Sequence, residues 1–216
     1  MKGDTILLTL AFMVVIISIG GTIFTYSFIE NFKNTWLTGF ATGGTVNFTV
    51  ESIVSINFTN DTINFGSGRV NIGSTRAELL TTGPTGTITN GNWTADTGFI
   101  VENIGNINVT VDIASGKTPA TFVGGTNPGY LWNVTAFNAA NVGATCLNNS
   151  GGVQAGGGVH ELGFFYTVNT SGVRFCANFS FVDAFDTLRI DFNITVPEDS
   201  TKGALSDSIT MTIAAG

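Results

Sequence analysis

The sequence predicts a mainly β protein with an N-terminal hydrophobic helix followed by an antiparallel β-sandwich, immunoglobulin-like or jelly-roll-like. Three observations predict this fold. Residues 5–29 are apolar and uncharged, apolar and polar residues alternate with period two in many later stretches, and glycine- and proline-containing turns separate those stretches. The predicted organisation is a transmembrane or filament-core helix over 1–29, a linker over 30–44 and an extracellular β-sandwich over 45–216.

The apolar segment has 25 residues, Thr5 to Ile29. At about 1.5 Å per residue, a helix of this length spans the roughly 30 Å hydrocarbon core of a membrane. Lys2 before it and Glu30 after it favour a cytoplasmic N-terminus with the remaining chain outside. Three fates stay open: a retained anchor, cleavage after Lys2-Gly3 that leaves the helix for a filament core, or removal as a signal peptide after a small residue near Ser18-Ile19-Gly20.

Residues 30–44 lack a sustained periodicity and end in Gly43-Gly44, which predicts a linker. Trp36, Leu37 and Phe40 are more apolar than a linker requires. Two interpretations remain for them: an aromatic belt at the membrane interface, or a docking segment for a neighbouring subunit.

Period-two alternation predicts the strands of the sandwich. The strongest example runs over 188–196, where leucine, isoleucine, phenylalanine and valine alternate with charged and polar residues. Similar stretches occupy 45–58, 107–113 and 208–213. Shorter runs lie at 62–65, 69–72, 98–102, 130–136, 159–168 and 173–181. About eight to ten short strands, each with one apolar face, indicate two sheets packed face to face.

Composition restricts the partners. Charged residues make up 11% of the chain, and 8 basic against 15 acidic residues give a net charge of −7. Because phosphate binding needs a basic patch and the basic residues are scattered singly, no nucleic acid partner is expected. A surface rich in amides and hydroxyls is typical of an extracellular β protein.

Two cysteines, Cys146 and Cys176, are predicted to form a disulfide, because an even pair in an exported chain most simply pairs. On the chain-entropy model, closing a loop of this size contributes roughly 3 to 4 kcal/mol to the free energy of unfolding. Two unpaired buried thiols are the alternative.

The chain contains ten Asn-x-Ser/Thr sequons, which predict N-linked glycans on an exported domain. Six of these asparagines fall out of phase with the apolar residues of their strands, so we expect their side chains to face solvent: Asn47, Asn57, Asn108, Asn133, Asn178 and Asn193. The ten candidates are Asn47, Asn57, Asn60, Asn92, Asn108, Asn133, Asn148, Asn169, Asn178 and Asn193.

No catalytic, cofactor-binding or metal site is predicted. His160 is the only histidine, and no recognisable motif surrounds it. Asp183, Asp186 and Asp191 lie close in sequence, and oxygen ligands of this kind can bind calcium at the rim of a β-sandwich. Their spacing does not match an EF-hand loop, and loop carboxylates are usually solvated, so we expect no metal. With one histidine and no motif, we also expect no cofactor and no enzymatic activity.

Several stretches resemble known families. GTVNFTVESIVSINFTNDTINFGSGRV, VENIGNINVTVDI, LWNVTAFN and RIDFNITVPEDSTKGALSDSITMTI, together with the apolar N-terminus, resemble small secreted proteins of DPANN-type archaea. They are also similar to the β-sandwich subunits of archaeal and bacterial surface filaments, both pilin-like and donor-strand types. The resemblance implies an extracellular, cell-surface location, membrane-anchored or within a filament.

Two functions are expected from these features. The first is a structural subunit of an archaeal surface assembly, a filament or pilus, tube or coat, whose partners are copies of itself, joined through the N-terminal helix or by strand addition. The second is a monomeric, membrane-anchored adhesion or binding module that uses loops such as 117–129 or 146–158. Both place the membrane contact in residues 5–29.

Overall fold

The structure, a computed structural model, describes residues 2–36, 48–137, 142–146, 149–150, 153–154 and 160–216. It divides the chain into two compact units, Met1–Val50 and Glu51–Gly216. The boundary therefore lies a few residues later than the start of the predicted sandwich at residue 45.

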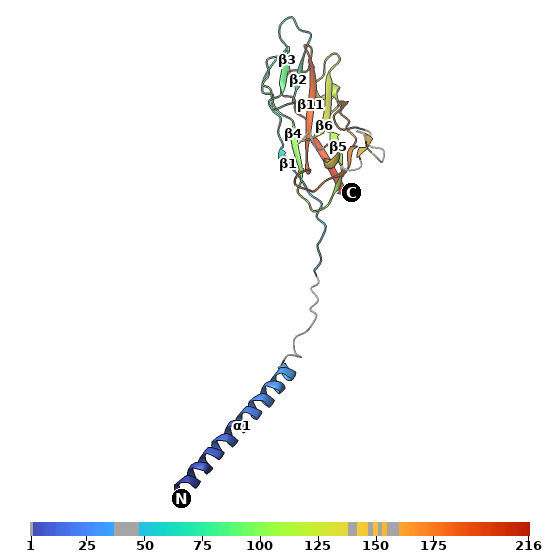
Figure 1. Ribbon diagram of the computed structural model, residues 1–216. Helices are drawn as coiled ribbons and strands as arrows, with labels where there is room; N and C mark the ends of the chain where they lie inside the picture. Colours follow the sequence, from blue (N-terminus) through green and yellow to red (C-terminus); the bar gives the residue numbers. More distant parts are fainter. Residues whose placement is uncertain (1, 37–47, 138–141, 147–148, 151–152, 155–159) are drawn as a thin grey trace. The chain divides into compact units, whose positions relative to one another are not determined.

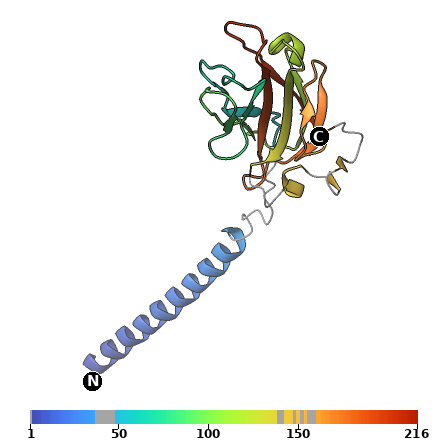
Figure 2. The same cartoon turned by 90° about the horizontal axis from the view of Figure 1, so that it is seen from above.

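The first unit contains helix α1 (Lys2–Trp36), which is continuous in both views (Figures 1 and 2). Its stretch Thr9–Ser27 is long and apolar enough to cross a membrane, a test that a signal sequence also passes. The helix extends beyond Ile29, so residues 30–36 are helical where a linker was predicted. No glycine or proline lies between Gly21 and Gly39, which is consistent with the extension of the helix to Trp36. The predicted contacts of Trp36, Leu37 and Phe40 lie outside the described side chains.

The second unit is centred on β11 (Thr187–Pro197), which belongs to a seven-stranded antiparallel sheet. One edge of β11 pairs first with β4 (Phe99–Asn103) and then with β2 (Arg76–Leu80), and the other edge pairs with β6 (Gly129–Ala136), as Figure 1 shows. The remaining strands extend the sheet: β1 (Ile56–Asn60) beside β4, β3 (Thr87–Thr89) beside β2, and β9 (Tyr166–Thr167) beside β6.

A second antiparallel sheet has the order β10 (Val173–Phe179), β5 (Val109–Ser115) and β12 (Ile209–Ala215). Strand β5 alternates strictly between buried and half-buried residues, as its period-two sequence predicts. Short elements complete the unit: helices α2 (Pro119–Phe122) and α3 (Val142–Thr145) and the hairpin of β7 (Asn149–Ser150) and β8 (Val153–Gln154).

The two sheets share one hydrophobic core. Val111, Ile113 and Phe179 from the smaller sheet pack in the same cluster as Leu188 and Trp132 from the larger sheet, and each of these side chains is at most 1% exposed. The predicted fold class is therefore confirmed: the chain is mainly β, with an N-terminal apolar helix and antiparallel sheets packed as in a β-sandwich, one of them curled as a half-barrel.

The long strand predicted over 45–58 is only partly present. Strand β1 begins at Ile56, and residues 48–55 belong to no strand. Alternation in the sequence shows which side chains share a face, but a strand also needs a neighbouring backbone, and residues 48–55 have no ladder partner within the described chain. Residues 45–47 lie outside the described part.

Candidate functional site

An open cleft of about 990 Å³, lined by both apolar and polar side chains, lies within the second unit. One wall is the segment 62–70 and the other is the segment 197–207. The floor is formed by inward-facing side chains of the larger sheet, namely Leu79, Phe99, Tyr130, Phe192, Ile194 and Val196. Of the floor side chains only that of Phe99 is half-buried, and the others are at most 8% exposed. The cleft is the candidate functional site because it is a concave surface in which half-buried apolar side chains such as Phe99 and Trp93 lie beside polar groups of the two walls.

Aromatic rings run along this floor in an unbroken series. The centroids of Phe99 and Phe192 are 5.5 Å apart with planes at 81°, and those of Phe192 and Tyr130 are 5.7 Å apart at 26°. Phe58 and Phe122 extend the series at its two ends, 5.8 Å from Phe99 and 4.7 Å from Tyr130. Such edge-to-face and offset pairs stabilise a fixed arrangement, so the rings form a rigid part of the core beneath the cleft, in which Phe192 and Tyr130 are 2% and 4% exposed.

The first wall is held by glycine packing and by backbone bonds. The amide of Thr94 donates to the carbonyl of Phe65 at 2.9 Å, and the amide of Asn64 donates to a carboxylate oxygen of Asp96 at 2.6 Å. The Trp93 ring lies so close to Gly68 that a β-carbon there would sit 2.3 Å from the indole. The glycine therefore lets the wall approach the tryptophan that lines the cleft.

The second wall is fixed to α2 and to the loop after it. The amide of Thr201 donates to the carbonyl of Val123 at 3.1 Å, and Figure 2 shows the red loop beside the yellow-green helix. Thr126 donates to Asp199 through both its amide (2.9 Å) and its hydroxyl (2.7 Å). These two hydrogen bonds lower the pKa of Asp199. The carboxylate that holds the loop is therefore in its charged form.

A polar group closes the end of the cleft near β12. The carboxylate oxygen Oδ2 of Asp207 accepts hydrogen bonds from the hydroxyls of Ser115 at 2.5 Å and Tyr130 at 3.2 Å. Burial, and to a lesser extent the Asp207 charge, raises the pKa of Tyr130, so the phenol stays protonated and acts as a donor. The Nζ of Lys117 donates to the carbonyl of Ser206 and fixes the adjoining chain.

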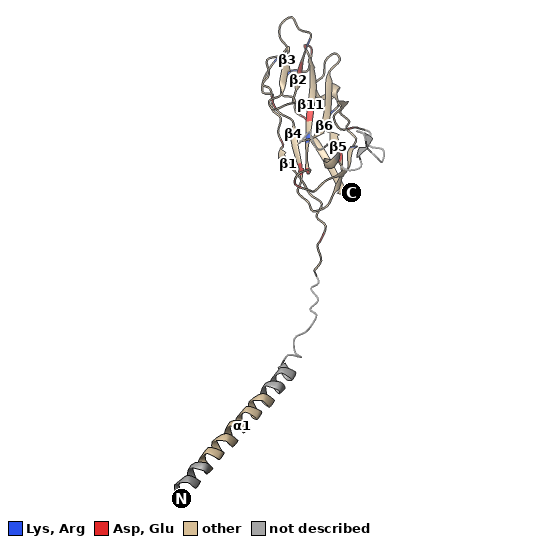
Figure 3. Ribbon diagram, in the orientation of Figure 1, with Lys and Arg blue, Asp and Glu red and all other residues tan. Residues whose placement is uncertain are grey.

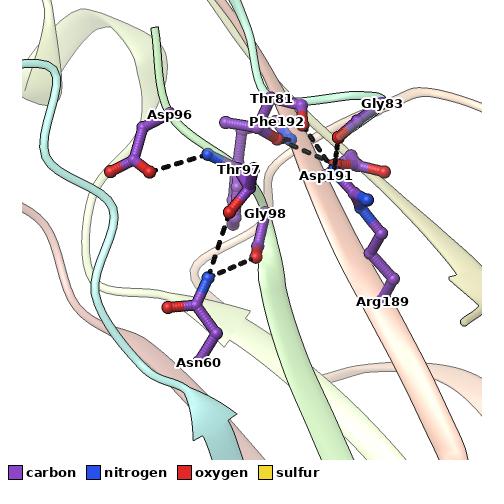
Figure 4. A network of polar contacts seen from close by, with 9 residues as sticks. All are labelled: Asn60, Thr81, Gly83, Asp96, Thr97, Gly98, Arg189, Asp191 and Phe192. Atoms are coloured by element: carbon purple, nitrogen blue, oxygen red, sulfur yellow. Dashed lines mark hydrogen bonds and ion pairs between the residues drawn. The ribbon is translucent and has the colours of Figure 1, made fainter. Parts of the chain in front are cut away.

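A second polar network lies where β4 and β2 meet along β11 (Figure 4). The Nε of Arg189 donates to Oδ1 of Asp191 at 2.9 Å, and its Nη2 donates to the carbonyls of Thr81 (2.7 Å) and Gly83 (2.6 Å). The Thr81 hydroxyl donates to Asp191 and accepts from the amide of Phe192. These bonds join β11 to the chain that follows β2, so the network stabilises the fold. Figure 3 shows both signs of charge on β11.

The three aspartates considered for calcium do not form one group. Asp183 is exposed, the Asp186 carboxylate accepts from Thr187, and Asp191 is committed to Arg189 and Thr81. Among the described residues, no group of three or more histidine, cysteine, aspartate or glutamate side chains could hold a metal ion.

His160 lies outside the cleft. Its ring stacks on Tyr166 with centroids 4.1 Å apart, and its Nδ1 accepts a hydrogen bond from Nε1 of Trp132 at 3.1 Å. Partial burial lowers the pKa of His160, which matches the neutral ring that this acceptor role requires. The histidine thus contributes to packing at the edge of the core.

The two cysteines lie together as expected. Cys146 and Cys176 form a disulfide with Cα atoms 5.7 Å apart, and both residues are buried. The bond joins the segment after α3 to β10, beside the bridge between Cys146 and Phe179.

The sequon asparagines differ in exposure. Asn57, Asn92 and Asn169 are exposed, while Asn60, Asn108, Asn178 and Asn193 are half-buried, and Asn47 and Asn148 lie outside the described residues. The expectation that Asn133 faces solvent is wrong, because its side chain is only 6% exposed. It lies opposite the buried Asp191 in the ladder between β6 and β11, where both faces of the sheet are covered.

Sequence reasoning did not find the cleft. The inward phase of Phe99 and Phe192 predicts core side chains and gives no sign that a cleft lies above them. The one available signal was the Gly66-Ser67-Gly68 turn, whose lack of side chains allows the close approach of Trp93.

Comparison with known proteins finds no matching protein-family model, no matching curated protein and no matching solved structure. The function is therefore argued from the geometry of the chain itself.

Proposed function

We propose that this protein is a structural subunit of an archaeal cell-surface assembly, such as a filament, tube or coat, and that its main partners are copies of itself. The observation that carries the proposal is apolar surface outside the core, on α1 and on the extended segment before β1. Phe12 and Phe24 of α1 are 70% and 73% exposed, and Phe48 of the segment is 82% exposed. Exposed apolar surface of this extent marks an interaction site.

Helix α1 supports either a membrane or a filament-core setting. Its apolar side chains are exposed all around the described part, so only lipid or other helices can cover them. The hydroxyl of Thr22 donates to the carbonyl of Ser18 at 2.6 Å, and that of Thr25 donates to Gly21, which satisfies both hydroxyls inside the helix. Beside Gly20 and Gly21 the space is open, which permits close helix contacts.

An extracellular location supports the same proposal. A buried disulfide is typical of exported proteins, and an N-terminal apolar helix is typical of anchors and signal sequences. The exposed sequons at Asn57, Asn92 and Asn169 are the best candidates for N-linked glycans, because an attached sugar there would meet solvent.

The test is the composition of sheared surface material from cells that produce the protein. Negative-stain images should show assemblies, and mass spectrometry should find this chain as their main component. Its N-terminal peptide should retain residues 5–29. Recovery of the chain only as a detergent-solubilised monomer would contradict the proposal.

A second candidate function is a monomeric, membrane-anchored adhesion or binding module. The cleft with Trp93 at its side favours it, since ligands bind in concave surfaces that combine apolar side chains with a few polar groups. A chain that remains monomeric in detergent and binds a ligand in this cleft would support the module over the subunit.

A further inference from the structure

Most of the exposed large apolar side chains of the second unit lie at one end of it. They belong to the chain before β1 and to the loops that follow β4, β6 and β10. These six side chains, each between 40% and 57% exposed, are Ile53, Val54, Ile104, Phe137, Phe181 and Val182. The other exposed large apolar side chains in the described part of this unit are Ile72, Phe164 and Leu205. We call the first set the apolar end.

Hydrogen bonds to the loop between β4 and β5 hold two of these segments in place. The amide of Ile53 donates to the side-chain oxygen of Asn106 at 2.6 Å, and the amide of Asn106 donates to the carbonyl of Ile53 at 3.1 Å. The amide of Phe181 donates to the side-chain oxygen of Asn108 at 3.2 Å. The chain before β1 and the loop after β10 therefore meet at the same loop.

The start of β11 joins the remaining segments to this end. The amide of Phe137 donates to the carbonyl of Thr187 at 3.0 Å, and the amide of Asn103 donates to the carbonyl of Asp186 at 2.8 Å. The ends of β6 and β4 thus flank the first residue of β11. In Figure 1, β1 and the C-terminus lie toward this end of the unit, and β2 and β3 lie toward the other. Since β11 has 11 residues, its far end is about 33 Å away.

The chain enters the second unit at the apolar end. The unit begins at Glu51, whose carbonyl accepts a hydrogen bond from the side-chain amide of Asn106 at 2.8 Å. Residues 37–50 join Glu51 to the end of α1, and a stretch of this length spans at most about 50 Å. Its last part is apolar as well, since Phe48 and Val50 are 82% and 72% exposed. A chain that keeps α1 in a bilayer is therefore tethered to that bilayer through its apolar end.

The charge of the apolar end argues against a second copy as the surface that covers it. Glu51 and Asp183 are exposed there, and the segments 51–55, 103–108 and 180–186 contain no lysine or arginine. Two copies that met end to end would bring like carboxylates together, which is unfavourable. A lipid surface with neutral headgroups carries no net charge, and apolar side chains enter its interface without help from basic residues.

We propose that the apolar end is a second membrane-binding site, which inserts Ile104, Phe137, Phe181 and Val182 into the interface of the bilayer that α1 spans. This inference goes beyond the proposed function, because it requires α1 to stay in a membrane but does not require copies to assemble. The contact orients the β-sandwich on its tether. The cleft wall 197–207, which begins where β11 ends, then faces away from the lipid.

The test uses the full chain in phosphatidylcholine vesicles, with photoreactive benzoylphenylalanine in place of Phe181. After irradiation, mass spectrometry should find lipid joined to residue 181. The control carries the same probe in place of Ile72, which is 94% exposed and lies four residues before Arg76, the partner of Pro197 at the far end of β11. Because the probe there is distant from the interface, its lipid adduct should be at least about tenfold lower.

Three results would overturn the inference. They are equal lipid adducts at the two positions, an adduct of residue 181 to a second copy in place of lipid, and a chain that does not float with the vesicles. An adduct to a second copy would at the same time support the subunit proposal. Sheared surface material without assemblies would contradict that proposal and leave the lipid adduct unaffected.

Substitutions give an independent measurement. Ile104→Asp and Val182→Asp each place a carboxylate in a different loop of the apolar end, and each should lower the lipid adduct at residue 181 at least about fivefold. Ile72→Asp is the matched control and should leave the adduct unchanged. All three positions are exposed, and near-ultraviolet circular dichroism should show an intact fold in each variant. An unchanged adduct in both folded apolar-end variants would refute the lipid contact.

Discussion

Replacing Arg189 by methionine should destabilise the second unit strongly, because it leaves the carboxylate of Asp191 buried without its cation. The Asp191 side chain is 2% exposed and that of Arg189 is 17% exposed, so water screens the pair little. Removing one partner of a buried pair costs about 3 to 5 kcal/mol. The Thr81 and Gly83 carbonyls also lose their donor.

The surface pair of Arg174 and Asp112 supplies the matched control. The distance between the donor nitrogen and the carboxylate oxygen is the same 2.9 Å, but the side chains are 43% and 29% exposed. Arg174→Met should therefore change the free energy of unfolding by only about 0 to 1 kcal/mol. The assay is urea unfolding of the full chain in detergent, followed by near-ultraviolet circular dichroism.

The double variant Arg189→Met/Asp191→Leu completes the experiment. Because both charges are removed, it should recover part of the stability that Arg189→Met loses. If Arg189→Met costs no more than Arg174→Met, the claim that the buried network holds β2 and β4 against β11 is refuted.

Three further predictions concern the cleft wall, the histidine and the disulfide. Gly68→Ala should lower the free energy of unfolding by about 1 to 3 kcal/mol, because the added carbon clashes with the indole of Trp93. Gly172→Ala is the control and should be nearly neutral in the same urea assay, because the nearest atom is 3.8 Å from the added carbon. The folded-state pKa of His160 lies below its ordinary value of 6.5. The free energy of unfolding should therefore be highest above pH 6.5 and should decrease as the pH falls through the folded pKa. The decrease should be smaller in His160→Gln. Cys146→Ala/Cys176→Ala should lose roughly 3 to 4 kcal/mol on the chain-entropy model, and a reductant should shift the wild type but not this variant.

The sequence predicted the sandwich strands well where alternation coincides with a long ladder to at least one neighbouring strand. The stretch 188–196 became the central β11, and 107–113 and 208–213 correspond closely to β5 and β12. In these strands the apolar phase alone determines the buried face, because each is fixed by a long ladder to its neighbours.

Other features depend on contacts between segments that are distant in the sequence, and local alternation does not predict such contacts. Residues 48–55 alternate as clearly as a strand, yet within the described chain they have no ladder. Asn133 has the outward phase but is buried, because both faces of β6 are covered. The cleft depends on how far the smaller sheet extends over the larger one, a property of the assembled sheets and not of any single strand.

The most direct test of the account asks whether copies of this chain assemble with one another at the cell surface. Surface material sheared from producing cells would be examined by negative-stain microscopy and by mass spectrometry. The account predicts filaments, tubes or sheets whose main protein is this chain. Recovery of the chain solely as a monomer from detergent-solubilised membranes would contradict it.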